Sequence, residues 1–174
     1  SAAYSPDGKT IVTASADETA RIWDATTRQE LRQLRGHTGP FLSATYSPDG
    51  KTIVTVTADG IARIWDATTG QELRQLQSHA DSIFSAALSA AYSPDAKTIV
   101  TASYDRTARV WDAATGQELR ELRGHTGYVG SAAYSPDGRT IVTASGDGTA
   151  RVWDAATGQE LRQLKGHTKG VRSA

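Results

Sequence analysis

The chain has 174 residues, and its 19 basic side chains (Lys and Arg) balance 19 acidic ones (Asp and Glu), so its formal net charge is zero. This balance argues against a protein held mainly by the phosphates of a nucleic acid. No apolar run approaches the roughly 20 residues that a bilayer span needs. Cysteine is absent, which excludes disulfides and thiolate metal ligands. Methionine is also absent, so we expect a mature or excised piece, cytoplasmic if no targeting segment is missing.

An internal repeat organises the whole sequence. Tryptophan occurs only at positions 23, 65, 111 and 153, at spacings of 42, 46 and 42 residues. A Tyr-Ser-Pro-Asp motif recurs in step with it, beginning at Tyr4, Tyr46, Tyr92 and Tyr134. Residues 91–126 and 133–168 differ at six of 36 positions. The chain therefore consists of four copies of one repeat unit.

The unit predicts four short strands, taken here in chain order from the fourth copy. Residues 129–135 alternate loosely and end at a Pro-Asp-Gly turn, and residues 140–145 are rich in β-branched side chains. A Gly-Asp-Gly turn precedes the alternating residues 149–153, and a Thr-Gly turn precedes residues 160–164. Residues 159–165 are also compatible with a helix, although too few for a stable one. We expect an antiparallel meander without a crossover helix.

Three features make the unit resemble the WD40 repeat: Gly-His before the first strand, Asp between the second and third strands, and Trp-Asp closing the third. The near-identity of the copies resembles the highly repetitive WD40 proteins of bacteria. The resemblance implies an all-β propeller of four-stranded antiparallel blades. The four blades would span approximately residues 1–36, 37–78, 79–124 and 125–166, and residues 167–174 would begin the strand that closes the ring.

WD40 blades are pinned by a hydrogen-bonded tetrad of His, Thr (or Ser), Asp and Trp, and the resemblance places one in each blade. The members are His37, Thr55, Asp59 and Trp65 in blade two; His79, Thr101, Asp105 and Trp111 in blade three; His125, Thr143, Asp147 and Trp153 in blade four; and Thr13, Asp17 and Trp23 in blade one. The histidine of blade one could come only from His167, at the other end of a chain. We expect all four indoles to be largely buried and bonded to the threonines. Ser78 and Ile61 depart from the motif.

Nucleophilic catalysis also uses His, Asp and a hydroxyl, but we predict that the protein is not an enzyme. All four histidines occupy the same slot of the repeat, and a catalytic set rarely recurs four times in one context. They also lie 42 or more residues apart, which argues against a metal site. We therefore expect no catalytic residue, no cofactor and no metal.

Residues that differ between copies are the candidates for partner binding. Those selected are Tyr104, Arg106, Tyr128, Phe41 and Arg172. The resemblance places their loops on one face of the propeller, the top, and aromatic and arginine side chains are enriched at interfaces. An acidic or aromatic peptide is the expected ligand class. The alternative is neutral drift in tolerant loops, with Phe41 filling core.

Four blades are fewer than the seven or eight usual in WD40 rings, and an open arc would expose strand edges and apolar faces. We therefore expect a homodimer that closes an eight-bladed ring. The alternatives are a closed four-bladed monomer and a fragment of a longer chain. A four-residue near-copy, Ser85 to Leu88, lengthens the loop before blade three. The expected function is a non-catalytic scaffold for a protein or peptide; the alternative is a purely structural, excised or engineered repeat fragment without a partner.

Overall fold

The computed structural model describes residues 1–76 and 87–173, which form sixteen strands and no helix. The first sheet holds β1 (Ala2–Tyr4), β2 (Thr10–Ala14), β3 (Ala20–Asp24) and β4 (Glu30–Leu34). The second holds β5 (Phe41–Tyr46), β6 (Thr52–Thr57), β7 (Ala62–Asp66) and β8 (Glu72–Leu76). The third holds β9 (Ala87–Tyr92), β10 (Thr98–Ser103), β11 (Ala108–Asp112) and β12 (Glu118–Leu122). The fourth holds β13 (Val129–Tyr134), β14 (Thr140–Ser145), β15 (Ala150–Asp154) and β16 (Glu160–Leu164).

Each sheet is an antiparallel meander in which sequential strands are hydrogen-bonded neighbours. In the fourth sheet Val142 lies opposite Val152, and Ile141 lies opposite Trp153. This confirms the all-β prediction. The last strand of that sheet, β16, is extended rather than helical because it pairs with β15, where Val152 lies opposite Arg162. We call each sheet a blade.

The turn that joins the first two strands of a blade is built by its Ser-Pro-Asp sequence and the residue after it, which is glycine except for Ala96 in blade three. In blade one the Asp7 carboxylate accepts hydrogen bonds from the Ser5 hydroxyl at 2.7 Å and from the Lys9 N–H at 3.1 Å. Gly8 adopts a φ of 70°, a left-handed conformation that costs glycine little. The same motif therefore makes the same turn wherever the sequence repeats it.

The hydrophobic core lies between blades rather than within them. The tryptophan-bearing side of a blade, its leading face, packs on the trailing face of the blade before it. Trp65 of blade two packs against Val12, Ile22 and Leu34 of blade one. Equivalent clusters join blades two and three around Trp111 and blades three and four around Trp153. Apolar residues recur on both faces of a blade because each inner blade is covered on both sides.

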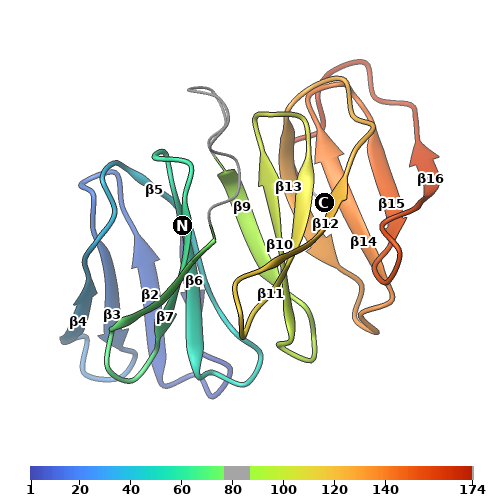
Figure 1. The fold of residues 1–174 in the computed structure, drawn as a ribbon. Helices are drawn as coiled ribbons and strands as arrows, with labels where there is room; N and C mark the ends of the chain where they lie inside the picture. The colour runs from blue at the N-terminus through green and yellow to red at the C-terminus, as the bar shows by residue number, and fades with distance from the viewer. Residues whose placement is uncertain (77–86, 174) are drawn as a thin grey trace.

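The four blades form an open arrangement, with the first and last blades at its two ends (Figure 1). Among the described residues, no core cluster joins blade four to blade one. Trp65, Trp111 and Trp153 are 1–2% exposed, whereas Trp23 is only partly buried because no blade lies on its face. Trp23 is therefore less buried than the other three indoles, although all four were expected to be largely buried. The arrangement also differs from a closed four-bladed monomer.

The longer spacing before blade three lies partly outside the described residues. In β9, Ser89 pairs with Ala102 and Tyr92 with Ile99, so the second of the two near-copies lies wholly within the strand, which also includes Ala87 and Leu88. The register of β9 shifts next to Ser103, which faces Ala87. The positions Ser85 and Ala86 of the near-copy fall outside the part of the chain that is described.

Candidate functional site

The tetrad of blade four is a continuous chain of hydrogen bonds. The Trp153 indole N–H donates to the Thr143 hydroxyl oxygen at 2.9 Å. His125 Nε2 lies 2.8 Å from the same hydroxyl, and His125 Nδ1 lies 2.8 Å from Asp147 Oδ2. A consistent direction runs from the indole N–H to Thr143, from the Thr143 O–H to Nε2, and from the Nδ1 N–H to the carboxylate. Every polar group of the chain then has a partner.

Blade two repeats this arrangement, but both hydroxyl positions of its loop, Thr57 and Ile61, differ from those of the other blades. Trp65 donates to Thr55 at 2.7 Å, and His37 Nε2 lies 2.8 Å from the same hydroxyl. Ile61 stands where other blades have threonine, so its side chain gives Asp59 no hydroxyl bond. The Thr57 hydroxyl donates to Asp59 instead, at a position that is serine in the other blades. The departure at Ile61 is thus compensated within the same loop.

The other two tetrads are seen in part. Trp111 donates to Thr101 at 2.9 Å and Trp23 donates to Thr13 at 2.8 Å, so all four indoles bond to the expected threonines. His79 and Ser78 lie outside the described residues. His167 is exposed and its ring forms no hydrogen bond within the part of the chain that is described.

Burial favours the neutral form of two tetrad histidines, His125 and His37. It lowers the pKa of His125 below 6.5, although the hydrogen bond to Asp147 works in the opposite direction. Burial and the neighbouring Arg63 cation likewise lower the pKa of His37 against the hydrogen bond to Asp59. For Asp147 itself, burial raises the pKa, but hydrogen bonds from Thr149 and His125 outweigh it and leave the pKa far below its ordinary value. A neutral imidazole beside a carboxylate is the state that the hydrogen-bond direction requires.

The tetrads offer little to a chemical reaction. The Thr143 hydroxyl is fully buried and is engaged by both an indole and an imidazole, so it is not a free nucleophile. Within the described ranges, no three His, Asp or Glu side chains form a group that could hold a metal ion. The arrangement is suited to holding the strands and loops of a blade together.

A different set of residues meets where blades three and four adjoin. Tyr104, on the turn between β10 and β11, and Tyr128, just before β13, have ring centroids 5.4 Å apart and planes inclined by 44°. Their exposed fractions are 51% and 36%. The pair is therefore an aromatic surface contributed by two blades.

The sequence of blade four makes room for this pair. Gly146 occupies the position of Tyr104 in the next blade, and a Cβ there would lie 2.5 Å from the Tyr128 ring. Tyr128 thus lies over Gly146 on one side and beside Tyr104 on the other. Gly146 is not among the residues predicted from the sequence, although it is the one glycine at a position that is Ala16, Ala58 or Tyr104 elsewhere.

Arg106 lies on the same turn as Tyr104. It is exposed, and among the described residues it forms no hydrogen bond or ion pair with either tyrosine or with any other side chain. Its φ is 73°, a left-handed conformation that Gly60 and Gly148 adopt at the equivalent positions. The backbone therefore carries strain of about 1–2 kcal/mol at Arg106 that a glycine would avoid.

Comparison with known proteins identifies the repeat. The family model described as "WD domain, G-beta repeat" matches residues 1–24, 28–66, 70–112 and 116–154, which is most of the chain. The chain belongs to the WD40 family. It is also 49% identical over 37 residues to the "Notchless protein homolog" of Arabidopsis thaliana, a match that covers 21% of this chain and 8% of that protein. The chain thus spans less than a tenth of that relative.

The two remaining expected partner-binding residues, Phe41 and Arg172, differ in their placement. Phe41 is 5% exposed and packs edge-on against His37 at 4.7 Å, in the core between blades one and two. It is therefore a core residue and cannot contact a partner, because its strand position faces the neighbouring blade. Arg172 is exposed beyond the last WD40 blade, and its backbone carbonyl and the Tyr128 ring both adjoin Gly130, so this segment passes close to Tyr128.

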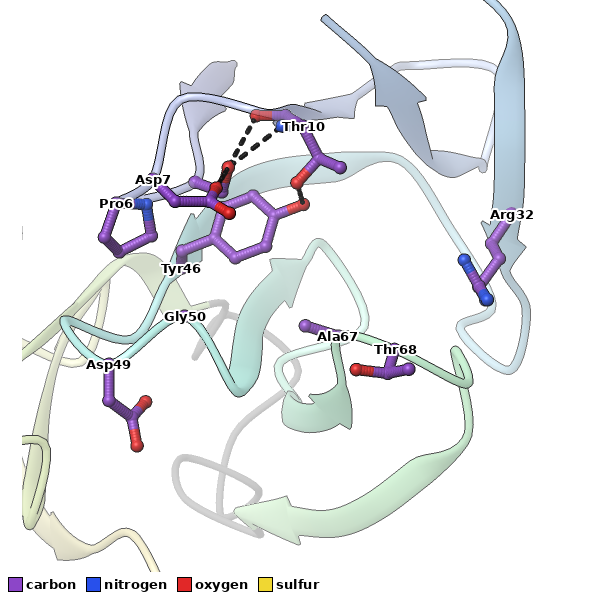
Figure 2. Close-up of a pocket in the computed structure, with 10 residues that line it drawn as sticks. Pro6, Asp7, Thr10, Arg32, Tyr46, Asp49, Gly50, Ala67 and Thr68 are labelled. Atoms are coloured by element: carbon purple, nitrogen blue, oxygen red, sulfur yellow. Dashed lines mark hydrogen bonds between the residues drawn. The ribbon is translucent and has the colours of Figure 1, made fainter.

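Two interactions that the sequence analysis missed recur along the chain. An arginine of each third strand pairs with a glutamate of the fourth, as in Arg151–Glu160 at 2.7 Å and Arg21–Glu30 at 3.0 Å. A tyrosine of each later blade bonds to a threonine of the blade before it, as in Tyr46 and Thr10 at 2.9 Å (Figure 2). Both sets could have been found, because the four copies keep these residues.

The end of the propeller opposite the tyrosine pair carries shallow cavities between blades. One of about 330 Å³ lies between blades one and two, with Asp7, Asp49, Arg32 and Tyr46 in its lining (Figure 2). A second of about 420 Å³ lies at the equivalent place between blades three and four. None of the described residues form a helix that could cross a membrane.

Proposed function

We propose that this WD40 chain is a non-catalytic scaffold that binds a protein or peptide through one face of the propeller. We call this the top face: it holds the loops that enter each blade and the turns between second and third strands. The observation that carries the proposal is the exposed Tyr104–Tyr128 pair, with rings 5.4 Å apart. Tyrosine and arginine supply large contact areas and directional bonds at interfaces.

The turn of Arg106 supports the same site. Its guanidinium is exposed, and the residue keeps a left-handed conformation in a place where two other blades have glycine. A cation beside two aromatic rings suits a ligand with carboxylate and aromatic groups. An acidic, aromatic peptide is the ligand class of this proposal.

The tetrads, in this proposal, are structural in all four blades. Their repetition, burial and saturated hydrogen bonds support a role in holding each blade together. The approximate blade limits of residues 1–36, 37–78, 79–124 and 125–166, with residues 167–174 beginning a further blade, remain part of the proposal.

The binding proposal is tested with a displayed library of random peptides selected on the purified chain. We expect selected peptides to be rich in acidic and aromatic residues and to lose binding to a triple variant, Tyr104→Ala, Arg106→Gly and Tyr128→Pro, which carries residues of blade two. Glu18→Gly changes the equivalent turn of blade one and is the matched control. If no peptides are enriched, or if the triple variant binds them as well as the control does, the chain acts as a structural module instead.

We further propose that the working form is a homodimer whose eight blades close a ring. The partly buried Trp23 and the open ends of the arrangement support it, because a second chain would cover them. His167 of one chain would then complete the tetrad of Thr13, Asp17 and Trp23 in the other. Light scattering on the purified chain should give twice the mass of 18.5 kDa, and a mass of one chain at micromolar concentration would contradict the ring.

A further inference from the structure

Every internal junction between blades is made from the same residues. The last leucine of one blade lies under the tryptophan of the next: Leu34 under Trp65, Leu76 under Trp111 and Leu122 under Trp153. These three leucines are 0–1% exposed. The leading face of each later blade thus fits the trailing face of the blade before it, because the same residues recur in every copy.

A hydrogen bond accompanies the apolar contact at each junction. Tyr46, Tyr92 and Tyr134 each place their hydroxyl 2.9 Å from the hydroxyl of Thr10, Thr52 and Thr98 in the preceding blade. Burial raises the pKa of Tyr92 to about 12, which keeps its hydroxyl protonated. The pair fixes the register of one blade against the next as well as their separation.

The two ends of the chain present the two halves of this junction. On the trailing face of blade four, Leu164 is 51% exposed, although its three counterparts are buried. On the leading face of blade one, Tyr4 is 67% exposed, whereas Tyr46 and Tyr92 are 8–9% exposed. Thr140, the counterpart of the three bonded threonines, has no tyrosine opposite it among the described residues.

The segment after blade four already follows the path that leads from one blade to the next. The Val171 N–H donates to the Ser145 carbonyl at 2.8 Å, as the Phe41 N–H donates to the Ser15 carbonyl at 3.1 Å where blade one passes into blade two. His167 precedes Val171 by the same four residues that separate His37 from Phe41. The backbone here therefore runs toward the position of a following blade.

We propose that the trailing face of blade four, centred on Leu164, is a docking surface for the leading face of blade one of a second copy of this chain. The inference rests on the proposed homodimer and specifies how its chains meet. Tyr4 of one chain bonds to the partner's Thr140, and the contact occurs twice around the ring. A second copy is the occupant because it carries a leading face, and leading faces pack on trailing faces at all three junctions within the chain. The net charge of zero also means that two copies do not repel each other.

Two leucines of β16 allow a matched test. Leu164 and Leu161 are both 51% exposed, but only Leu164 has buried counterparts. Leu31, Leu73 and Leu119, the counterparts of Leu161, are 43–45% exposed in blades that do have neighbours. A lysine at either position changes the same strand equally, whereas only Leu164→Lys places a charge in the proposed junction.

The self-association of the chain and its variants is measured by sedimentation. We expect Leu164→Lys to raise the dimer dissociation constant by at least about 100-fold, because it would bury an unpaired charge. Leu161→Lys should leave it within about two-fold. Tyr4→Phe removes only a hydroxyl from an exposed ring, so it should not affect folding. It should weaken the dimer about 10-fold, because each dimer loses two hydrogen bonds.

The outcomes separate the two proposals. If the wild-type chain sediments as a monomer, the ring and this docking surface both fail. If the wild type is a dimer and neither Leu164→Lys nor Tyr4→Phe weakens it, the dimer stands and the docking surface is wrong. Equal weakening by Leu161→Lys would also overturn it.

Discussion

Replacing Thr143 by valine tests the tetrad at its centre. The Thr143 hydroxyl has no solvent exposure and bonds to both the Trp153 indole and the His125 imidazole, which are 1% and 6% exposed. Valine has the same shape but leaves both groups without a partner. A buried polar group that loses its partner costs about 1–3 kcal/mol, so the variant should lose about 2–6 kcal/mol. Domains of this size are stable by only about 5–15 kcal/mol.

Urea unfolding followed by tryptophan fluorescence measures this loss. Blades of a repeat protein can unfold separately, so circular dichroism is recorded on the same samples to test whether the transition is shared. Thr126→Val is the control: this residue is next to His125, is exposed, and contacts Asp147 through its backbone N–H. The control should stay within about 0.5 kcal/mol of wild type. A loss of less than about 0.5 kcal/mol for Thr143→Val would refute the claim that this hydroxyl pins the blade.

Two further predictions concern pH and backbone strain. The pKa values of His37 and His125 are lower in the folded chain than 6.5, so the unfolded chain binds more protons, and stability should be complete above about pH 6.5 and fall as the pH drops below it. The urea midpoint at pH 8 and pH 5.5 measures this, and a His37→Gln, His125→Gln double variant that keeps the same pH dependence would contradict it. Ala96 has a φ of 59° where Gly138 and its counterparts have about 70°, so Ala96→Gly should remove about 1–2 kcal/mol of strain against a glycine entropy cost of about 0.5–1 kcal/mol. A thermal midpoint below that of wild type would contradict this second prediction.

The repeat made the fold predictable in detail. Each strand and turn occurs in four copies. Residues 159–165 were compatible with a strand or a helix, but the repeat leaves too few residues there for a stable helix. The indole–threonine bonds were implied by the resemblance to the WD40 repeat, and they are physically sensible because a buried N–H needs an acceptor.

What the repeat could not predict depends on neighbouring blades. Trp23 and Trp65 have the same local sequence, but only Trp65 has a blade on its face. Phe41 was selected because it differs between copies, yet Val129 and Val171 at the equivalent positions are apolar too, which was a signal for core. The packing of Tyr128 over Gly146 could not be predicted from the sequence, because these residues are 18 positions apart and are brought together only by the fold.

The uniformity of the tyrosine–threonine junctions has a consequence for how such a chain can change over generations. The hydroxyl pair is 2.9 Å apart at all three junctions, and each partner comes from the same place in its own unit. A recombination event that deletes or duplicates one 42-residue unit therefore brings together two faces that already fit. The length of the array can vary in whole units without any junction having to evolve anew, whereas an exchange out of phase by even one residue would send the strand's side chains to the opposite face.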